Sequence, residues 1–108
     1  MSFDNKVVWI TGASSGIGAA LAREWAKRGA HLVLSGRDEA RLSEVGADCG
    51  ETLTLPFDVR DDSALAAATE KAIAWKGGVD FAVGLFQHAV GVIAEDHVDR
   101  FAANNGLF

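Results

Sequence analysis

Blocks of apolar and polar residues alternate along this chain and predict strands and helices in turn. Short apolar runs rich in branched side chains predict strands of a parallel sheet at residues 6–10, 31–35, 52–57 and 79–85. Longer stretches with apolar positions three or four residues apart predict helices between them, ending near residues 28, 45 and 75. This order predicts an α/β fold with helices on both faces of the sheet and right-handed crossovers.

The first two helices have recognisable faces and ends. Ile17, Leu21 and Trp25 fall four residues apart, so we expect them on the buried face of the first helix. Gly29 is its expected stop, because glycine readily adopts the left-handed conformation that ends many helices. Asp38 precedes the second helix and is expected to cap its N-terminus.

The last quarter of the chain departs from this alternation. Residues 86–93 are apolar without a clear period, and residues 94–103 predict a last helix. Because no fifth strand is predicted, the fourth strand becomes an apolar edge of the sheet, which favours pairing with another chain. We therefore expect self-association, or a partner that covers the fourth-strand edge. A single domain over residues 1–108, with 84–108 as its divergent tail, is the simplest organisation.

Composition narrows the possible functions. The chain has 108 residues, 49% of them hydrophobic and 23% charged, with a net charge of −5. This acidic balance argues against nucleic acid or an anionic membrane as a partner. No apolar run approaches the roughly 20 residues that span a bilayer. Cys49 is the single cysteine, which fits a reducing compartment, so we expect a cytoplasmic location and a small, partly buried thiol.

The stretch that says most about function is Thr11-Gly12-Ala13-Ser14-Ser15-Gly16-Ile17-Gly18, between the first strand and the first helix. Three glycines at this spacing allow a sharp turn and leave backbone amides at the helix N-terminus open to a phosphate. It is not a Walker A loop, because no Gly-Lys-Ser/Thr follows. The turn predicts a nucleotide-binding site, and a tight turn without a ligand is the alternative.

This stretch resembles the T-G-x-x-x-G-x-G signature of the short-chain dehydrogenase/reductase family. Asp58-Val59, after the third strand, resembles the family's D-V pair, which contacts adenine, and Val79-Asp80 also fits. The similarity covers about residues 6–83. It implies a three-layer Rossmann-type sheet, truncated at about four strands in the order 3-2-1-4, and a nicotinamide dinucleotide. The implied cofactor-binding residues are Gly12, Ser14, Ser15, Gly16, Ile17, Gly18, Arg37, Asp58 and Val59.

The residues after the second strand favour NADP over NAD. NAD-binding proteins usually place an acidic side chain there to bond the ribose 2′-hydroxyl. Here Gly36 takes that position and Arg37 follows, and a planar guanidinium suits a 2′-phosphate. Ser14 and Ser15 add hydroxyl donors for the same phosphate. The alternative for Arg37 is a solvated surface side chain.

The resemblance does not extend to catalysis. Family members transfer hydride with a serine, a Tyr-x-x-x-Lys pair and an asparagine, but this chain has no tyrosine. The N-N-A-G motif expected after the fourth strand is also absent, so we assign no catalytic and no metal-binding residue. We expect an NADP(H)-binding domain whose catalytic half is missing from this chain. Two alternatives are a divergent, non-catalytic nucleotide-binding or regulatory module and an oxidoreductase completed by another chain.

Overall fold

The computed structural model describes residues 3–14, 16–58, 60–86 and 89–94, with side chains described as far as Val83. The elements follow in chain order as β1 (Val7–Thr11), α1 (Gly16–Lys27), β2 (His31–Gly36), α2 (Glu39–Ala47), β3 (Thr52–Pro56), α3 (Asp62–Ala74), η1 (Trp75–Gly77), β4 (Phe81–Phe86) and β5 (Ala89–Ala94).

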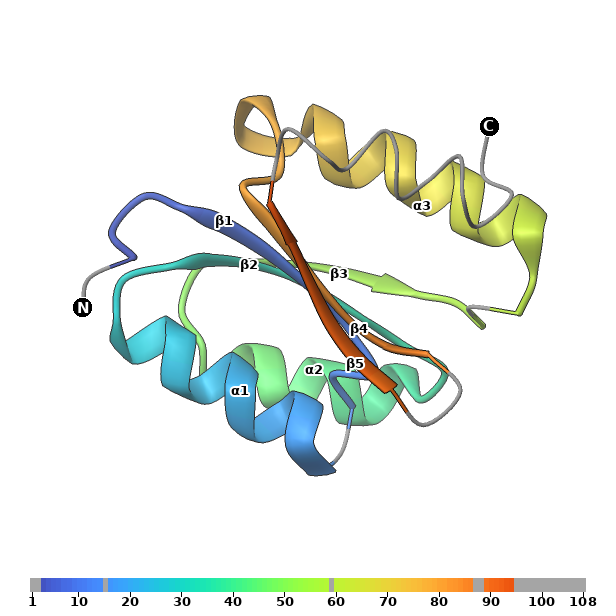
Figure 1. Cartoon of the computed structure of the whole chain (residues 1–108). Helices are drawn as coiled ribbons and strands as arrows, with labels where there is room; N and C mark the ends of the chain where they lie inside the picture. Colours follow the sequence, from blue (N-terminus) through green and yellow to red (C-terminus); the bar gives the residue numbers. More distant parts are fainter. Residues whose placement is uncertain (1–2, 15, 59, 87–88, 95–108) are drawn as a thin grey trace.

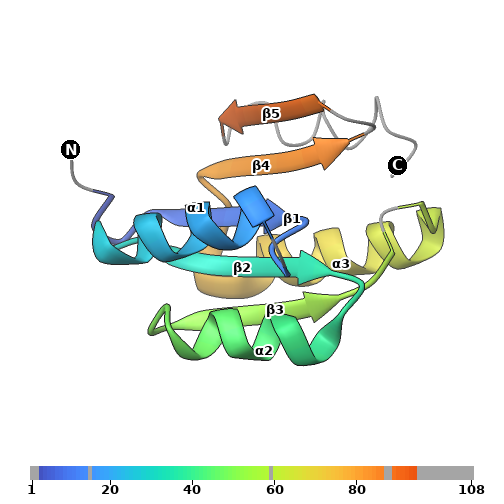
Figure 2. The ribbon, with the colours of Figure 1, turned by 90° about the horizontal axis from the view of Figure 1, so that it is seen from below.

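One sheet with the strand order β3-β2-β1-β4-β5 forms the centre of the molecule (Figure 2). The first four of these strands are parallel, with Val8 opposite both Leu32 of β2 and Phe81 of β4. Helices α1 and α2 cover one face of the sheet and α3 covers the other (Figure 1). The predicted α/β Rossmann-type fold, with four parallel strands in the order 3-2-1-4, is therefore confirmed.

The prediction that β4 is the edge of the sheet is wrong. β5 pairs antiparallel with the whole of β4, from Phe81 opposite Ala94 to Phe86 opposite Ala89. An antiparallel partner needs only a short connection, whereas a parallel one needs a crossover of a dozen or more residues. Residues 89–94 escaped prediction because their continuous apolar run has neither helical nor strand periodicity. The predicted helix over residues 94–103 lies almost wholly outside the described residues.

The apolar core forms two layers because alternate residues of a strand point to opposite faces of the sheet. All five residues of β1 are buried, as expected for a central strand covered on both faces. Val8 and Ile10 pack beneath α1 and α2, together with Leu42 of α2. Val7 and Trp9 pack on the other face, beneath α3.

The buried face of α1 differs from the predicted one. Ile17 is 61% exposed, and the residues fully buried in this helix are Gly18, Ala19 and Ala22. Leu21 and Trp25, the other two predicted positions, are partly buried against the core. The start of α1 lies so close to the preceding turn that only small side chains fit beneath it. This close approach displaces Ile17 to the outer side.

The predicted ends of α1 and α2 are confirmed. Gly29 has a φ of 89°, in the left-handed region that favours glycine. The Asp38 side chain accepts a hydrogen bond from the backbone N–H of Arg41 at 3.1 Å and so caps α2. Because β1, β2 and β3 are parallel, their carboxyl ends lie at the same edge of the sheet.

Candidate functional site

The glycine-rich turn lies at the carboxyl end of β1 and leads directly into α1. Gly12 and Gly16 have φ values of 74° and 59°, a region that side-chain-bearing residues rarely adopt. Gly18 has a different role, because a methyl group there would overlap the carbonyl oxygen of Gly12 and lie 2.7 Å from its carbonyl carbon. The turn and the helix can therefore pack this closely only with glycine at position 18.

The N-terminus of α1 is open toward this turn. Its first turn carries no acidic side chain that would compete for the helix amides. Apart from its chain neighbours and the backbone of its own helix, no described residue has a heavy atom within 4 Å of the point where a side chain at Gly16 would begin. The partial positive charge of the helix terminus and its unpaired amides favour an anion here. The turn therefore fits the pyrophosphate of a dinucleotide, with exposed Ile17 at its rim.

Ser14 and Arg37 come together at the end of β2. A side chain at Gly36 would meet the Ser14 hydroxyl oxygen at 2.9 Å, so Ser14 lies directly against this glycine. Arg37 follows Gly36, is exposed, and its guanidinium forms no ion pair or hydrogen bond with the residues that the structure describes. Ser15 and Val59, the other two predicted contacts, lie outside the described residues.

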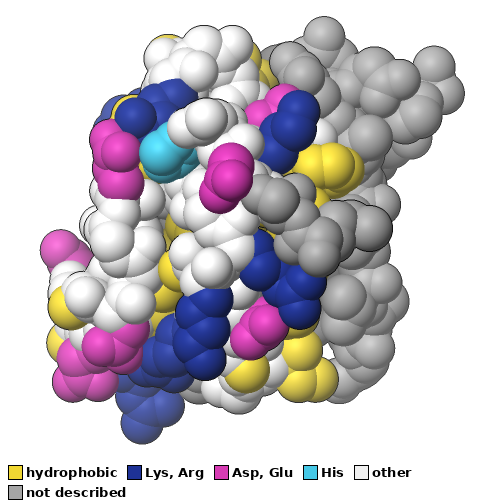
Figure 3. All heavy atoms as spheres, turned by 90° about the vertical axis from the view of Figure 1, so that its left-hand side faces the viewer, with side chains coloured by type: hydrophobic (Ala, Val, Ile, Leu, Met, Phe, Trp, Pro, Cys, Tyr) yellow, Lys and Arg dark blue, Asp and Glu magenta, His cyan; other side chains and the backbone are white. Residues whose placement is uncertain are grey.

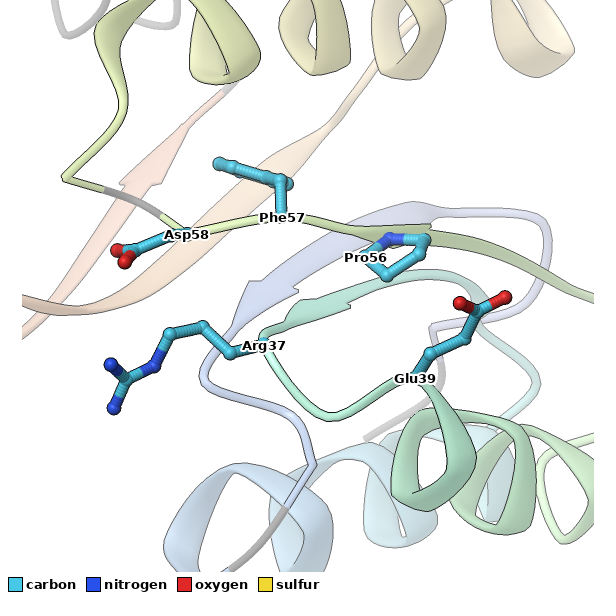
Figure 4. A pocket seen from close by; sticks show the side chains of 5 residues that line it. All are labelled: Arg37, Glu39, Pro56, Phe57 and Asp58. Carbon is cyan, nitrogen blue, oxygen red and sulfur yellow. The ribbon is translucent and has the colours of Figure 1, made fainter.

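A pocket of about 430 Å³ lies at the carboxyl ends of β2 and β3. Its lining residues are Arg37, Glu39, Pro56, Phe57 and Asp58. The Arg37 and Asp58 side chains extend to the same side, whereas Glu39 points the other way (Figure 4). The volume lies within the range of roughly 300–1,000 Å³ usual for small-molecule sites. Sequence reasoning identified two of the five lining residues and missed the apolar floor and Glu39.

Asp58 is held by a neighbour that sequence reasoning also missed. Its carboxylate accepts hydrogen bonds from the Arg60 backbone N–H at 2.9 Å and from the Arg60 guanidinium at 2.8 Å. These bonds to Arg60, with a smaller contribution from the charge of Arg37, lower the pKa of Asp58 to about 2. The Asp-x-Arg spacing of a side-chain-capped turn was the available signal. Asp58 is therefore an anion at neutral pH and accepts hydrogen bonds only.

We expect the Asp58 carboxyl to titrate with a midpoint of about 2 in an NMR pH titration of its side-chain carbon. Arg60→Ala should raise the midpoint toward the ordinary 3.8, and Arg37→Ala should raise it less. Because the folded pKa is lowered, the stabilisation is present above pH 4 or so and is lost as pH falls through about 2. A wild-type midpoint near 3.8 contradicts this account.

The opposite end of the sheet carries ion pairs. Figure 3 views this side, where Lys and Arg side chains are interspersed with Asp and Glu. The Lys76 ammonium lies 2.7 Å from a Glu51 carboxylate oxygen, and His31 Nδ1 lies 3.5 Å from the other oxygen. Glu51 is more than half exposed, so solvent screens these contacts and they add little to stability. These contacts link η1, which follows α3, to the amino ends of β2 and β3.

Other candidate chemistry is accounted for by packing. Cys49 is buried, and its burial raises the pKa of the thiol, as fits the small, partly buried side chain predicted for it. Within the described ranges, no three His, Cys, Asp or Glu side chains gather in a way that suits a metal ion. None of the helices in those ranges is long and apolar enough to cross a membrane.

The chain has the features of a Rossmann-type domain. These features are a sheet with four parallel strands, a glycine turn at the N-terminus of the first helix, and a pocket at the ends of the next two strands. A family model described as short chain dehydrogenase matches residues 6–102. The chain therefore belongs to the short-chain dehydrogenase family, whose members bind NAD or NADP.

Individual relatives agree with this assignment. Dehydrogenase/reductase SDR family member 7 of Mus musculus is 42% identical over 85 residues, which are 71% of this chain and 25% of that protein. A 3-ketoacyl-(acyl-carrier-protein) reductase from Brucella melitensis, complexed with NADH, is 36% identical with a TM-score of 0.70, covering 75% of this chain and 34% of its own. L-sorbose reductase from Gluconobacter frateurii, complexed with NADPH and L-sorbose, is 38% identical with a TM-score of 0.69, covering 76% and 33%.

The chain thus spans about a quarter to a third of the length of the relatives it matches. One of these neighbours holds NADH and another holds NADPH. The similarity therefore supports a dinucleotide cofactor for the family, and the choice between the two depends on the residues of this chain.

Proposed function

We propose that this chain is an NADP(H)-binding unit of a short-chain oxidoreductase. The observation that carries the proposal is the arrangement at the end of β2. Ser14 lies against Gly36 there, and Arg37, which forms no ion pair or hydrogen bond with the described residues, lines the pocket. The bound cofactor would supply the hydride, and this chain would hold its phosphates and adenine. The residues proposed for that role are Gly12, Ser14, Ser15, Gly16, Ile17, Gly18, Arg37, Asp58 and Val59.

The acidic side chains near Arg37 are each engaged or directed elsewhere. The Asp38 carboxylate caps α2 and so is drawn toward the backbone of its own helix. Glu39 points away from Arg37 across the pocket (Figure 4). Asp58 is paired with Arg60 at 2.8 Å, which leaves the Arg37 guanidinium available to a phosphate. A 2′-phosphate would gain a charge-assisted bidentate contact, whereas the 2′-hydroxyl of NAD would gain none.

Titration of the chain with NADPH and NADH, followed by fluorescence, tests this proposal. Arg37→Ala should weaken NADPH binding about 10- to 100-fold, the loss of one strong charge-assisted contact, and leave NADH binding unchanged. Arg41→Ala is the matched control, because Arg41 is an exposed arginine beside Asp38 that does not line the pocket. Equal or tighter binding of NADH to the wild type, with no loss in Arg37→Ala, would overturn the assignment.

Catalysis by this chain alone is a separate question. The chain has no tyrosine, so the Tyr-x-x-x-Lys pair implied by the family resemblance lies in no part of it. We expect NADPH binding without carbonyl reduction. Turnover by the isolated chain would instead favour the alternative in which unusual residues or another chain complete the active site.

The association predicted from the sequence stays a prediction, and its place changes. Because β5 covers β4, an added strand would pair with the outer side of β5 rather than with β4. Light scattering at high protein concentration tests it, and a monodisperse monomer would count against it. The cytoplasmic location likewise remains part of the proposal.

A further inference from the structure

A buried hydrogen bond joins β1 to β2 beneath α3. The indole N–H of Trp9 donates to the hydroxyl oxygen of Ser35 at 2.9 Å. Trp9 is 3% exposed and Ser35 is fully buried, so neither group has access to water as a substitute partner. The proposed cofactor contacts do not include this pair. Breaking it would leave a buried donor unsatisfied, which makes its geometry hard to alter.

Ser35 also connects the two halves of the proposed cofactor site. Its backbone carbonyl accepts a hydrogen bond from Ala13, inside the glycine turn, at 2.9 Å. The carbonyl of the next residue, Gly36, accepts from Phe57 on the pocket floor at 3.0 Å. The end of β2 is therefore held by three groups. The backbone N–H groups of Ala13 in the turn and Phe57 at the pocket bond to its carbonyls, and the Trp9 indole bonds to the Ser35 hydroxyl.

Arg37 is the first residue beyond this anchored point. Its exposed side chain forms no ion pair or hydrogen bond with the described residues, although its charge acts on the Asp58 carboxylate. The path of its backbone is set by Ser35 and Gly36, which the hydrogen bonds described above hold in place. Bidentate recognition of a phosphate requires the planar guanidinium in a defined orientation. A small rotation of the β2 end would move the Arg37 guanidinium, at the tip of a long side chain, farther than the turn amides, which the bond from Ala13 to Ser35 ties to the β2 backbone.

We propose that Trp9 and Ser35 are a positioning pair that orients Arg37 and so sets the preference for NADPH over NADH. The inference rests on the proposed NADP(H) site and adds to it two residues that touch no part of the cofactor. Loss of the pair should weaken NADPH binding selectively, because the pyrophosphate contacts at the glycine turn are shared by both cofactors.

The test compares the ratio of the NADH and NADPH dissociation constants in variants of the chain. Ser35→Ala should lower this ratio about three- to tenfold, mainly through weaker NADPH binding, as expected for a slight misplacement of one contact. The double variant Trp9→Phe/Ser35→Ala removes both partners and leaves no buried donor, so it should regain the stability that the unsatisfied indole costs, less the cost of the smaller phenylalanine ring, but keep the lowered ratio. Recovery of both together would mean that the bond only stabilises the fold.

Thr69→Val is the matched control. It deletes another buried side-chain hydrogen bond, from the Thr69 hydroxyl to the Leu65 carbonyl at 2.7 Å, which lies within α3 and does not involve β2. Its ratio should equal that of the wild type. A wild type that binds NADH as tightly as NADPH overturns the proposed function and this inference with it. A selective wild type whose ratio Ser35→Ala leaves unchanged overturns the inference alone.

A measurement on the wild type decides the case if the variants do not fold. NADP⁺ at saturation should slow hydrogen exchange of the Trp9 indole N–H more than NAD⁺ does, because a phosphate held by Arg37 immobilises the β2 end. The Trp9 signal is identified among the three indole signals by sequence-specific NMR assignment of the isotopically labelled wild type. Equal protection by the two cofactors overturns the positioning role.

Discussion

Replacing Gly18 by alanine is expected to destabilise the chain by about 3 kcal/mol and to abolish measurable dinucleotide binding. The added methyl group would overlap the Gly12 carbonyl oxygen, and backbone on both sides leaves no flexible side chain that could move away. The helix must therefore separate from the turn, which disperses the amides that would hold the pyrophosphate. Denaturant unfolding and an NADPH titration measure the two effects.

Gly50→Ala is the control for this prediction. Gly50 has a φ of 73°, so alanine there costs about 1–2 kcal/mol of backbone strain, but no heavy atom of the described residues crowds the new methyl group. Gly50 lies just before the amino end of β3, whereas the glycine turn lies at the carboxyl ends of the parallel strands. We expect lower stability with unchanged NADPH affinity. Equal loss of affinity in both variants would show that stability alone governs binding.

The fold was largely predictable because the central strands β1 and β2 are buried and rich in apolar, branched residues. Each run is bounded by glycine or by a capping aspartate such as Asp38, whose role the structure bears out. The two failures have different causes. Periodicity carries no information about the distance between elements, which explains the first. Ile17 has the right spacing for a buried face, but the close approach permitted by Gly18 sends it outward. β5 was not predicted because a uniformly apolar run shows neither helical nor strand periodicity.

The candidate site was predictable only where glycine or charge marks it. The glycine turn and the Arg37 position were predicted from spacing, and the structure brings Ser14 to Gly36 at their junction. Arg60 was missed because its effect on Asp58 depends on a local turn rather than on the family pattern. The bond between Trp9 and Ser35 joins residues 26 positions apart, and only the parallel register of β1 and β2 brings them together.

These observations make the end of β2, and not the glycine turn alone, central to the proposed cofactor site. The turn offers phosphate contacts that any dinucleotide would use, and it owes them to backbone geometry. The β2 end is where we propose that one cofactor is distinguished from the other, and it is held by the Trp9 side chain and by backbone bonds from Ala13 and Phe57. Residues that pack against the end of β2 should therefore affect the stability of the chain as well as cofactor binding.

Leu42→Ala should lower the free energy of unfolding by about 3 kcal/mol, or the melting temperature by roughly 12–24 °C. Leu42 is fully buried, and its Cδ2 lies 3.5 Å from the point where a side chain at Gly36 would begin. Truncation leaves a cavity between α2 and the sheet that the anchored β2 end cannot fill. Thermal and denaturant unfolding provide the measurement.

Leu55→Ala is the matched control, because Leu55 is half-buried on the α3 face of β3 and should cost about 1 kcal/mol. The difference between the two variants isolates the layer beneath α2 from the general cost of losing a leucine side chain. Equal losses in the two variants would contradict the tight packing of α2 behind Gly36. A large loss confined to Leu42→Ala would instead show that the packing of α2 behind Gly36 stabilises the end of β2, on which the proposed choice of cofactor depends.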